Sequence, residues 1–177
     1  MTSEIAIADP SLVVLVGAAG AGKSTFAARH FAPDEILSSD RFRAMVSGDE
    51  ANQKATKAAF VVLHKALERR FASRLTAVID ATSIEPSARR VLLERARAAG
   101  IPATAIVLDL PAATVIARNA ARPARVVDMA VVRRQLVRLR ASLDGPDPVI
   151  GREGFASVVI LRDPAEVDRV TVHRLRP

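Results

Sequence analysis

Residues 17–24 combine glycines, a lysine and a hydroxyl side chain at fixed spacing, with the sequence Gly17-Ala-Ala-Gly-Ala-Gly-Lys-Ser24. A continuous apolar run, Leu12 to Val16, precedes this segment, and a helical pattern from Lys23 to about Phe31 follows it. Glycines let a backbone curl around phosphate oxygens, and the amide groups at a helix N-terminus attract anions. The pattern Gly-x4-Gly-Lys-Ser between a strand and a helix is typical of the phosphate-binding P-loop.

Each residue type in this loop has an expected role toward a nucleoside triphosphate bound with Mg²⁺. Lys23 is expected to bridge the β- and γ-phosphates, and Ser24 to give its hydroxyl to the metal ion. Gly20 and Gly22 are expected to keep the cradle open where a side chain would collide with phosphate. The predicted nucleotide-binding segment comprises Gly17, Ala18, Ala19, Gly20, Ala21, Gly22, Lys23, Ser24 and Thr25.

Two sequence patterns that are absent reduce the number of reaction types to consider. The sequence has no Asn-Lys-x-Asp segment for reading guanine, which weakens a GTPase interpretation. Ala81 follows Asp80, so the Asp-Glu pair in which glutamate activates water in many ATPases is missing. A kinase, which transfers the γ-phosphate to an acceptor hydroxyl, fits better.

Two carboxylates follow predicted strands and are candidates for this chemistry. Asp40 comes just after a short strand, 36–38, and could accept the proton of the acceptor hydroxyl or could instead cap a helix. Arg43, three residues later, could contact a substrate phosphate nearby. Asp80 ends the strand 75–79 and could approach Mg²⁺ through water, orient an arginine, or be a solvated strand end.

Arginines concentrate in residues 118–143, which we predict to form a lid over the phosphates. Seven arginines lie between Arg118 and Arg140, where the sole acidic residue is Asp128. Arg118, Arg122 and Arg125 lie around the helix break at Pro123, from which mobile cations could neutralise charge in the transition state. For Arg122 the alternative is a solvated helix face.

Short apolar runs alternate with amphipathic stretches, which predicts a single α/β domain, 1–177, with a parallel sheet. The remaining strands are expected at 103–108 and 158–161, with a weaker edge strand around 170–172. Helices are expected from Pro86 to about Gly100 and over 111–121. Two apolar stripes mark further helices that face the core, and they comprise Phe60, Leu63, Leu67 and Phe71, and Val132, Leu136, Leu139 and Leu143.

Composition excludes several classes of function. The 177 residues contain no cysteine, and the three histidines are scattered along the chain. We therefore do not expect redox or transition-metal chemistry. No signal peptide or membrane span is predicted, so we expect a cytoplasmic protein without a membrane partner. The net charge of +7, with 22 Arg against 4 Lys, favours polyanionic partners, although a GC-rich genome would also produce such a bias.

Four segments together resemble the 5′-hydroxyl polynucleotide kinase family, especially the kinase module of bacterial polynucleotide kinase-phosphatase. They are Gly-Ala-Gly-Lys-Ser24, Ser-Ser-Asp-Arg-Phe-Arg43, Val-Ile-Asp-Ala-Thr82, and Arg118-Asn-Ala-Ala-Arg-Pro-Ala-Arg125 with the following Val-Val-Arg-Arg-Gln135. Their order and spacing span nearly the whole chain. One departure is Ser83, where the family commonly has Asn.

The resemblance implies a P-loop NTPase fold whose five strands, numbered along the chain, lie in the order 2-3-1-4-5. It also implies ATP as phosphate donor with Mg²⁺, a nucleic acid with a 5′-hydroxyl end as partner, and a role in nucleic acid repair. By this resemblance Asp40 is the general base, Arg43 contacts the acceptor-side phosphate, and Arg118 and Arg122 belong to the donor-binding lid. A small-molecule kinase similar to chloramphenicol phosphotransferases, or a nucleotide-dependent regulatory ATPase, remains an alternative.

Overall fold

The computed structural model of this protein describes residues 4–50, 52–123, 126–146 and 148–175. Its main sheet has five parallel strands in the order β3-β4-β2-β5-β6, which confirms the predicted order 2-3-1-4-5. The strand bounds are β2 Leu12–Val16, β3 Ile36–Ser38, β4 Ala77–Asp80, β5 Ala103–Leu108 and β6 Ser157–Leu161.

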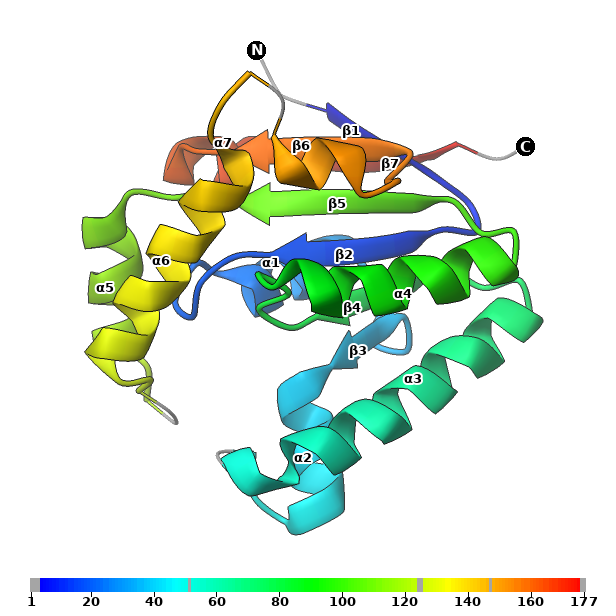
Figure 1. The fold of residues 1–177 in the computed structure, drawn as a ribbon, viewed down its shortest axis with the longest axis horizontal. Coiled ribbons are helices and arrows are strands. Elements are labelled where there is room, and N and C mark those ends of the chain that lie inside the picture. The colour runs from blue at the N-terminus through cyan, green and yellow to red at the C-terminus, as the bar shows by residue number, and fades with distance from the viewer. Residues whose placement is uncertain (1–3, 51, 124–125, 147, 176–177) are drawn as a thin grey trace.

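Helices cover both faces of this sheet: α4 lies on the near face in Figure 1 and α1 on the far face. The predicted helices are all present, and α2 and α7 are two that the sequence pattern did not predict. The helix bounds are α1 Lys23–His30, α2 Ser39–Ser47, α3 Thr56–Ala72, α4 Pro86–Ala98, α5 Ala112–Ala120, α6 Met129–Leu143 and α7 Pro164–Arg169, with 3₁₀ turns η1 Gln53–Ala55 and η2 Val149–Arg152. None of the described helices is long and apolar enough to span a bilayer.

The core forms around β2 and β5, every residue of which is buried. Burial on both faces explains why these strands are continuous apolar runs rather than alternating ones. In α3 the inward positions are Ala59, Leu63, Leu67 and Phe71. Phe60, predicted to be a core residue, is only partly buried and faces a cavity, because the small side chain of Ala59 takes the inward position.

The two ends of the chain form a second, two-stranded parallel sheet. β1, Glu4–Ala8, was not predicted, and it pairs with β7, Thr171–Leu175. The predicted tail strand therefore exists but does not extend the edge of the main sheet. Ile5 and Ile7 point into the core between exposed neighbours, which fixes the register of β1.

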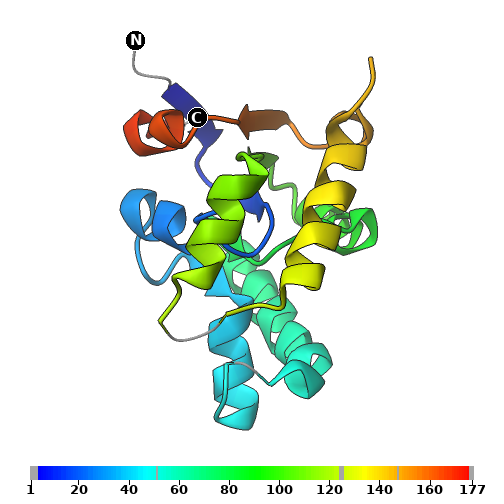
Figure 2. The same ribbon diagram turned by 90° about the vertical axis from the view of Figure 1, so that its left-hand side faces the viewer.

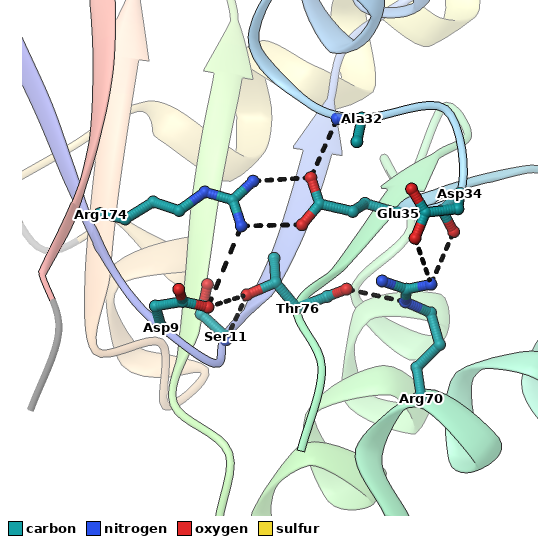
Figure 3. Close-up of polar contacts among 8 residues, drawn as sticks. All are labelled: Asp9, Ser11, Ala32, Asp34, Glu35, Arg70, Thr76 and Arg174. Carbon is teal, nitrogen blue, oxygen red and sulfur yellow. Dashed lines mark hydrogen bonds and ion pairs between the residues drawn. The ribbon is translucent and has the colours of Figure 1, made fainter. Parts of the chain in front are cut away.

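A set of polar contacts attaches this small sheet to the main one (Figure 3). The guanidinium of Arg174 in β7 donates to both carboxylate oxygens of Glu35, at 2.8 and 2.6 Å. The Thr76 hydroxyl donates to Asp9 and accepts from the backbone of Ser11, each at 3.0 Å. Since residues 11, 35 and 76 immediately precede β2, β3 and β4, these contacts, which we call the amino-edge cluster, lie at the amino ends of three strands.

The amino-edge cluster makes a prediction about stability in acid. Burial raises the pKa of Glu35, but the hydrogen bonds from Arg174 and from the Ala32 amide outweigh it, so the pKa is lowered from its ordinary 4.5. We expect Glu35→Gln to cost about 2 kcal/mol at pH 7, the scale of a hydrogen bond to a charged group. Because the folded pKa is lowered, this stabilisation is complete above about pH 5 and is lost as the pH falls through the folded pKa.

Urea unfolding of both proteins between pH 7 and pH 3 measures this difference. The exposed carboxylate of Glu94 in α4 supplies a matched control, since Glu94→Gln should leave the unfolding free energy within about 0.5 kcal/mol. A difference between wild type and Glu35→Gln that stays constant down to pH 3 would contradict the assigned role of Glu35.

Candidate active site

The phosphate-binding loop lies where β2 ends and α1 begins, at the carboxyl edge of the sheet. Lys23 is the first residue of α1, and the capping position before it, Gly22, supplies no side-chain cap. The first turn of α1 carries no acidic residue. Its backbone amides and dipole are therefore oriented toward this edge as a binding site for an anion.

Gly20 and Gly22 both adopt positive φ angles, +91° and +94°, a conformation that favours glycine. The expected reason for Gly20 was room for phosphate, but the structure shows a different one. A Cβ atom on Gly20 would collide with the backbone carbonyl oxygen of Val115 in α5. Glycine is thus required here because α5 packs directly against the loop.

Lys23 folds back onto the loop that it belongs to. Its ammonium donates to the carbonyl oxygens of Gly17 and Ala18, at 2.9 and 3.0 Å. Burial lowers the pKa of Lys23 to about 8, with Asp80 opposing this shift and Arg122 adding to it. The lysine is therefore held ready beside the loop and carries only part of a positive charge at pH 8.

A cleft of about 590 Å³ opens above the loop and brings together most of the predicted site. Its lining includes six of the predicted catalytic and metal-binding residues, which are Lys23, Ser24, Asp40, Arg43, Asp80 and Arg122. Ala19 and Gly20 of the loop also line it. Parallel strands place their carboxyl ends at one edge, which explains how residues 24, 40 and 80 converge.

Asp40 lies in the first turn of α2, and Ser38, whose hydroxyl accepts from the Arg41 amide, occupies the capping position. The alternative in which Asp40 is the helix cap is therefore wrong. Asp40 forms an ion pair with Arg43, and the Arg43 Nε donates to the carbonyl of Glu50 at 2.8 Å. The pair places a carboxylate and a guanidinium side by side in the lining of the cleft.

Ser24 and Asp80 supply the donors that could hold Mg²⁺. Among the described residues no group of three or more histidine and acidic side chains could bind a metal by itself. Mg²⁺ commonly uses one or two protein oxygens and completes its shell with water and substrate phosphates. One hydroxyl and one carboxylate lining a phosphate cleft fit that mode of binding.

The predicted lid, residues 118–143, includes the end of α5 and the whole of α6, and these two helices lie side by side in Figure 2. Buried Asn119 fixes this connection, since its side-chain amide donates to the Val127 carbonyl at 2.7 Å and its oxygen accepts from the Val127 amide at 3.1 Å. Arg122 lines the cleft. Arg118 lies over Gly22 of the loop instead, and Arg125 falls outside the described residues.

Helix α6 also contacts the site through residues that sequence reasoning did not single out. The side-chain oxygen of Gln135 accepts from the Ala19 amide at 2.9 Å, and Arg138 forms an ion pair with Glu85 after β4. Gln135 stood within a quoted motif, but a contact spanning 116 residues leaves no local signal. Gln53 and Phe60 line the cleft as well.

The segment after β4 is held by a fully buried arginine. Arg89 in α4 donates to the carbonyls of Ser83 and Ile84, at 2.9 and 2.5 Å, and pairs through two nitrogens with Glu153. The neighbouring Thr82 carbonyl accepts from the Gly17 amide at 3.0 Å. Arg89 thereby supports the phosphate-binding loop from behind.

The remaining predicted residues have other positions. Gly17, Ala18 and Ala21 form the buried back of the loop, while Thr25 is exposed on α1 and is not part of the cleft lining. Ser24 is exposed as well, but unlike Thr25 it lines the cleft.

Solved structures share this fold. The Pnkp1/Rnl/Hen1 RNA repair complex contains a chain with 20% identity and a TM-score of 0.65, over 76% of this chain and 45% of that one. A sugar kinase from Janibacter sp. has 21% identity and a TM-score of 0.59, over 90% and 91%. Kti12 of Chaetomium thermophilum, solved with ADP-AlF3, has 16% identity and a TM-score of 0.63, over 89% and 93%. This chain thus spans less than half of the Pnkp1-complex chain that it matches.

None of the curated proteins compared with the sequence matches it. A sequence model described as an AAA domain matches residues 12–146, which include the phosphate-binding loop, the strands β2 to β5 and the lid. Together with the parallel sheet and the kinase neighbours, this match establishes a P-loop kinase-like domain, and the chain belongs to the AAA domain family.

Proposed function

We propose that this protein transfers the γ-phosphoryl group of ATP to the 5′-hydroxyl end of DNA or RNA. The observation that carries the proposal is the Asp40–Arg43 ion pair in the same cleft as Lys23 and Ser24. A phosphate-binding loop alone would serve any nucleotide-binding protein. A carboxylate paired with a cation in that cleft adds what a phosphate acceptor needs, a proton acceptor for its hydroxyl and a positive charge for its phosphate.

In this mechanism the loop amides and Lys23 hold the β- and γ-phosphates. Mg²⁺ held by Ser24 and Asp80 would neutralise charge on the phosphate oxygens. Asp40 accepts the proton of the acceptor hydroxyl as its oxygen forms a bond to the γ-phosphorus. The bond from that phosphorus to the oxygen bridging the β-phosphate breaks, ADP leaves, and Arg122 stabilises the charge that develops.

Two observations support a nucleic acid as acceptor. One neighbour by fold belongs to an RNA repair complex, and residues 118–143 are rich in arginine, of which Arg122 lines the cleft. Arg43 beside Asp40 is suited to a phosphate one nucleotide from the reacting hydroxyl. Because the phosphate charge of nucleic acids attracts such surfaces regardless of sequence, recognition of the strand would be largely electrostatic.

A small-molecule acceptor is the second candidate function. It is favoured by a separate cavity of about 420 Å³ that adjoins the cleft, a volume typical of sites for small ligands. The sugar kinase that shares the fold phosphorylates, by its name, a small acceptor. Both candidates use the same donor site and the same Asp40.

The role of Asp40 is tested by substitution to Asn. With γ-labelled ATP, Mg²⁺ and a 5′-hydroxyl oligonucleotide, we expect Asp40→Asn to lower kcat by about 10²- to 10⁴-fold, the range for losing a general base. The KM for ATP should change little, because Asp40 does not belong to the phosphate-binding loop.

Asp144→Asn, at the exposed end of α6, provides a control that should retain full activity. Two results would count against the proposal. Undiminished phosphate release to water by Asp40→Asn, without transfer to any hydroxyl, would indicate a regulatory ATPase. No label on any oligonucleotide despite tight ATP binding would exclude the nucleic acid acceptor.

ATP binding should take up a proton at Lys23 near pH 8. The phosphates stabilise the ammonium form, so the pKa of Lys23, about 8 in the free protein, should rise on binding. Below pH 7 the lysine is already protonated and uptake vanishes, whereas above pH 8 the affinity for ATP should fall as pH rises.

Calorimetry at pH 8 in buffers of different ionisation enthalpy measures the uptake, which Lys23→Arg should abolish because arginine stays protonated. Equal uptake in both proteins would refute the assignment.

Salt distinguishes the two acceptor classes. If three phosphates of a single strand are neutralised, raising salt from 50 to 200 mM should weaken oligonucleotide binding about 20-fold through counterion release. An uncharged small acceptor should show no comparable dependence. The KM for the oligonucleotide is measured across this range beside the KM for ATP, and a salt-independent oligonucleotide KM would contradict electrostatic recognition.

A further inference from the structure

The cavity that adjoins the phosphate cleft lies between α3, α4 and α6 and the segment that follows β4. Its walls are mainly apolar, formed by Phe60, Ala88, Val91, Leu92 and Val131. The proposed transfer of phosphate uses none of these side chains. Apolar walls of this kind suit a ring or a hydrocarbon group.

The cavity and the phosphate cleft adjoin each other and share part of their lining. Phe60 and Val131 line both, as do Ala81, Thr82 and Gln135. A molecule in the cavity can therefore extend into the cleft that contains Asp40. The cavity therefore lies next to the cleft in which the acceptor hydroxyl is proposed to react.

The polar groups around the cavity carry a net positive charge. Glu85 is neutralised by its ion pair with Arg138. The side chain of Arg134 is exposed at the cavity, and no hydrogen bond or ion pair joins its guanidinium to a residue that the structure describes. Burial lowers the pKa of His64 below its ordinary 6.5, so its ring is neutral at pH 7. The surroundings thus combine an apolar interior with a guanidinium at the rim.

We propose that this cavity binds the base of the acceptor's 5′-terminal nucleotide, with Phe60 against the ring and Arg134 beside a phosphate of the strand. The proposal rests on the nucleic acid acceptor proposed above and adds where its terminal base lies. A base is flat and largely apolar on its faces, and stacking on an aromatic side chain contributes about 1–3 kcal/mol in strand-binding proteins. Phe60 lies where cavity and cleft meet, and its ring contacts that of His64, which also lines the cavity, with the ring centroids 6.0 Å apart.

The test fills the cavity from its rim. Ala88 is exposed on α4, so Ala88→Phe introduces bulk into the cavity without altering the buried core or any residue of the phosphate cleft. Ala98→Phe is the matched control, because Ala98 is exposed on the same helix and does not line the cavity. Both are assayed with a 5′-hydroxyl oligonucleotide and with the same oligonucleotide ending in an abasic residue.

We expect wild type to show at least a tenfold lower KM for the complete oligonucleotide than for the abasic one. Ala88→Phe should remove this difference by raising the KM for the complete oligonucleotide alone, with the KM for ATP unchanged, and Ala98→Phe should behave as wild type. Equal KM values for the two oligonucleotides in wild type, or a preference for the complete one that survives in Ala88→Phe, would overturn the inference.

If wild type labels neither oligonucleotide, the proposed function fails and the cavity is judged by binding alone. Adenosine 3′-monophosphate is then titrated by calorimetry into each protein in the presence of ADP and Mg²⁺. Binding that Ala88→Phe abolishes and Ala98→Phe retains would support a nucleotide-base site without the kinase reaction. Absent binding, or binding equal in both variants, would overturn it.

Discussion

The guanidinium of Arg89 connects the interior of this protein to its phosphate-binding loop. It is completely buried, and it donates to two carbonyls of the segment after β4 and to both oxygens of Glu153. Leaving such a cation without its carboxylate costs about 3–5 kcal/mol, so the pair determines where its neighbours lie. Ser83 adopts φ +46°, which is uncommon outside glycine, and the carbonyl bond from Arg89 helps to maintain it. Through Thr82 the same segment fixes Gly17, and its other side forms the wall of the proposed base site.

Much of the fold could be predicted from the sequence because its central signals are local. A β-branched run followed by a glycine-rich loop and a helix requires only neighbouring residues, and β2, the loop and α1 lie where that pattern placed them. The strand order came from the family resemblance, since periodicity does not specify which strands are neighbours. β1 was missed because a five-residue strand is stabilised by its partner β7, which begins 167 positions after it. Likewise, α2 begins directly at the end of β3, with no spacer to mark the change.

The site shows the same division between local and distant causes. Asp40, Asp80 and Ser24 follow strand ends, and parallel strands bring such positions to one edge, so their convergence was predictable. The residues that support this edge could not be predicted. Their contacts form only once the helices are packed, as those of Gln135, Asn119 and Arg89 show. Gly20 illustrates the limit of motif reasoning. The motif suggested that glycine is needed at this position to leave room for phosphate, but the structure shows that the close approach of α5 requires it.

The amino and carboxyl edges of the sheet carry different kinds of polar group. The amino-edge cluster joins the terminal strands to the body of the protein, while the carboxyl edge carries the groups proposed for chemistry. Charged and hydrogen-bonded residues thus stabilise the fold at a distance from the cleft. The residues lining the cleft and its adjoining cavity can therefore differ without disturbing those bonds.

Lys23 is bonded within the loop to which it belongs. Its ammonium already has two carbonyl partners within the loop, and burial reduces its charge near pH 8. A ligand must replace both carbonyl bonds to engage this lysine. A triphosphate spanning the loop can compensate through many contacts at once, whereas a lone inorganic phosphate offers few. Competition with these carbonyl bonds therefore favours a ligand long enough to span the loop over a small anion.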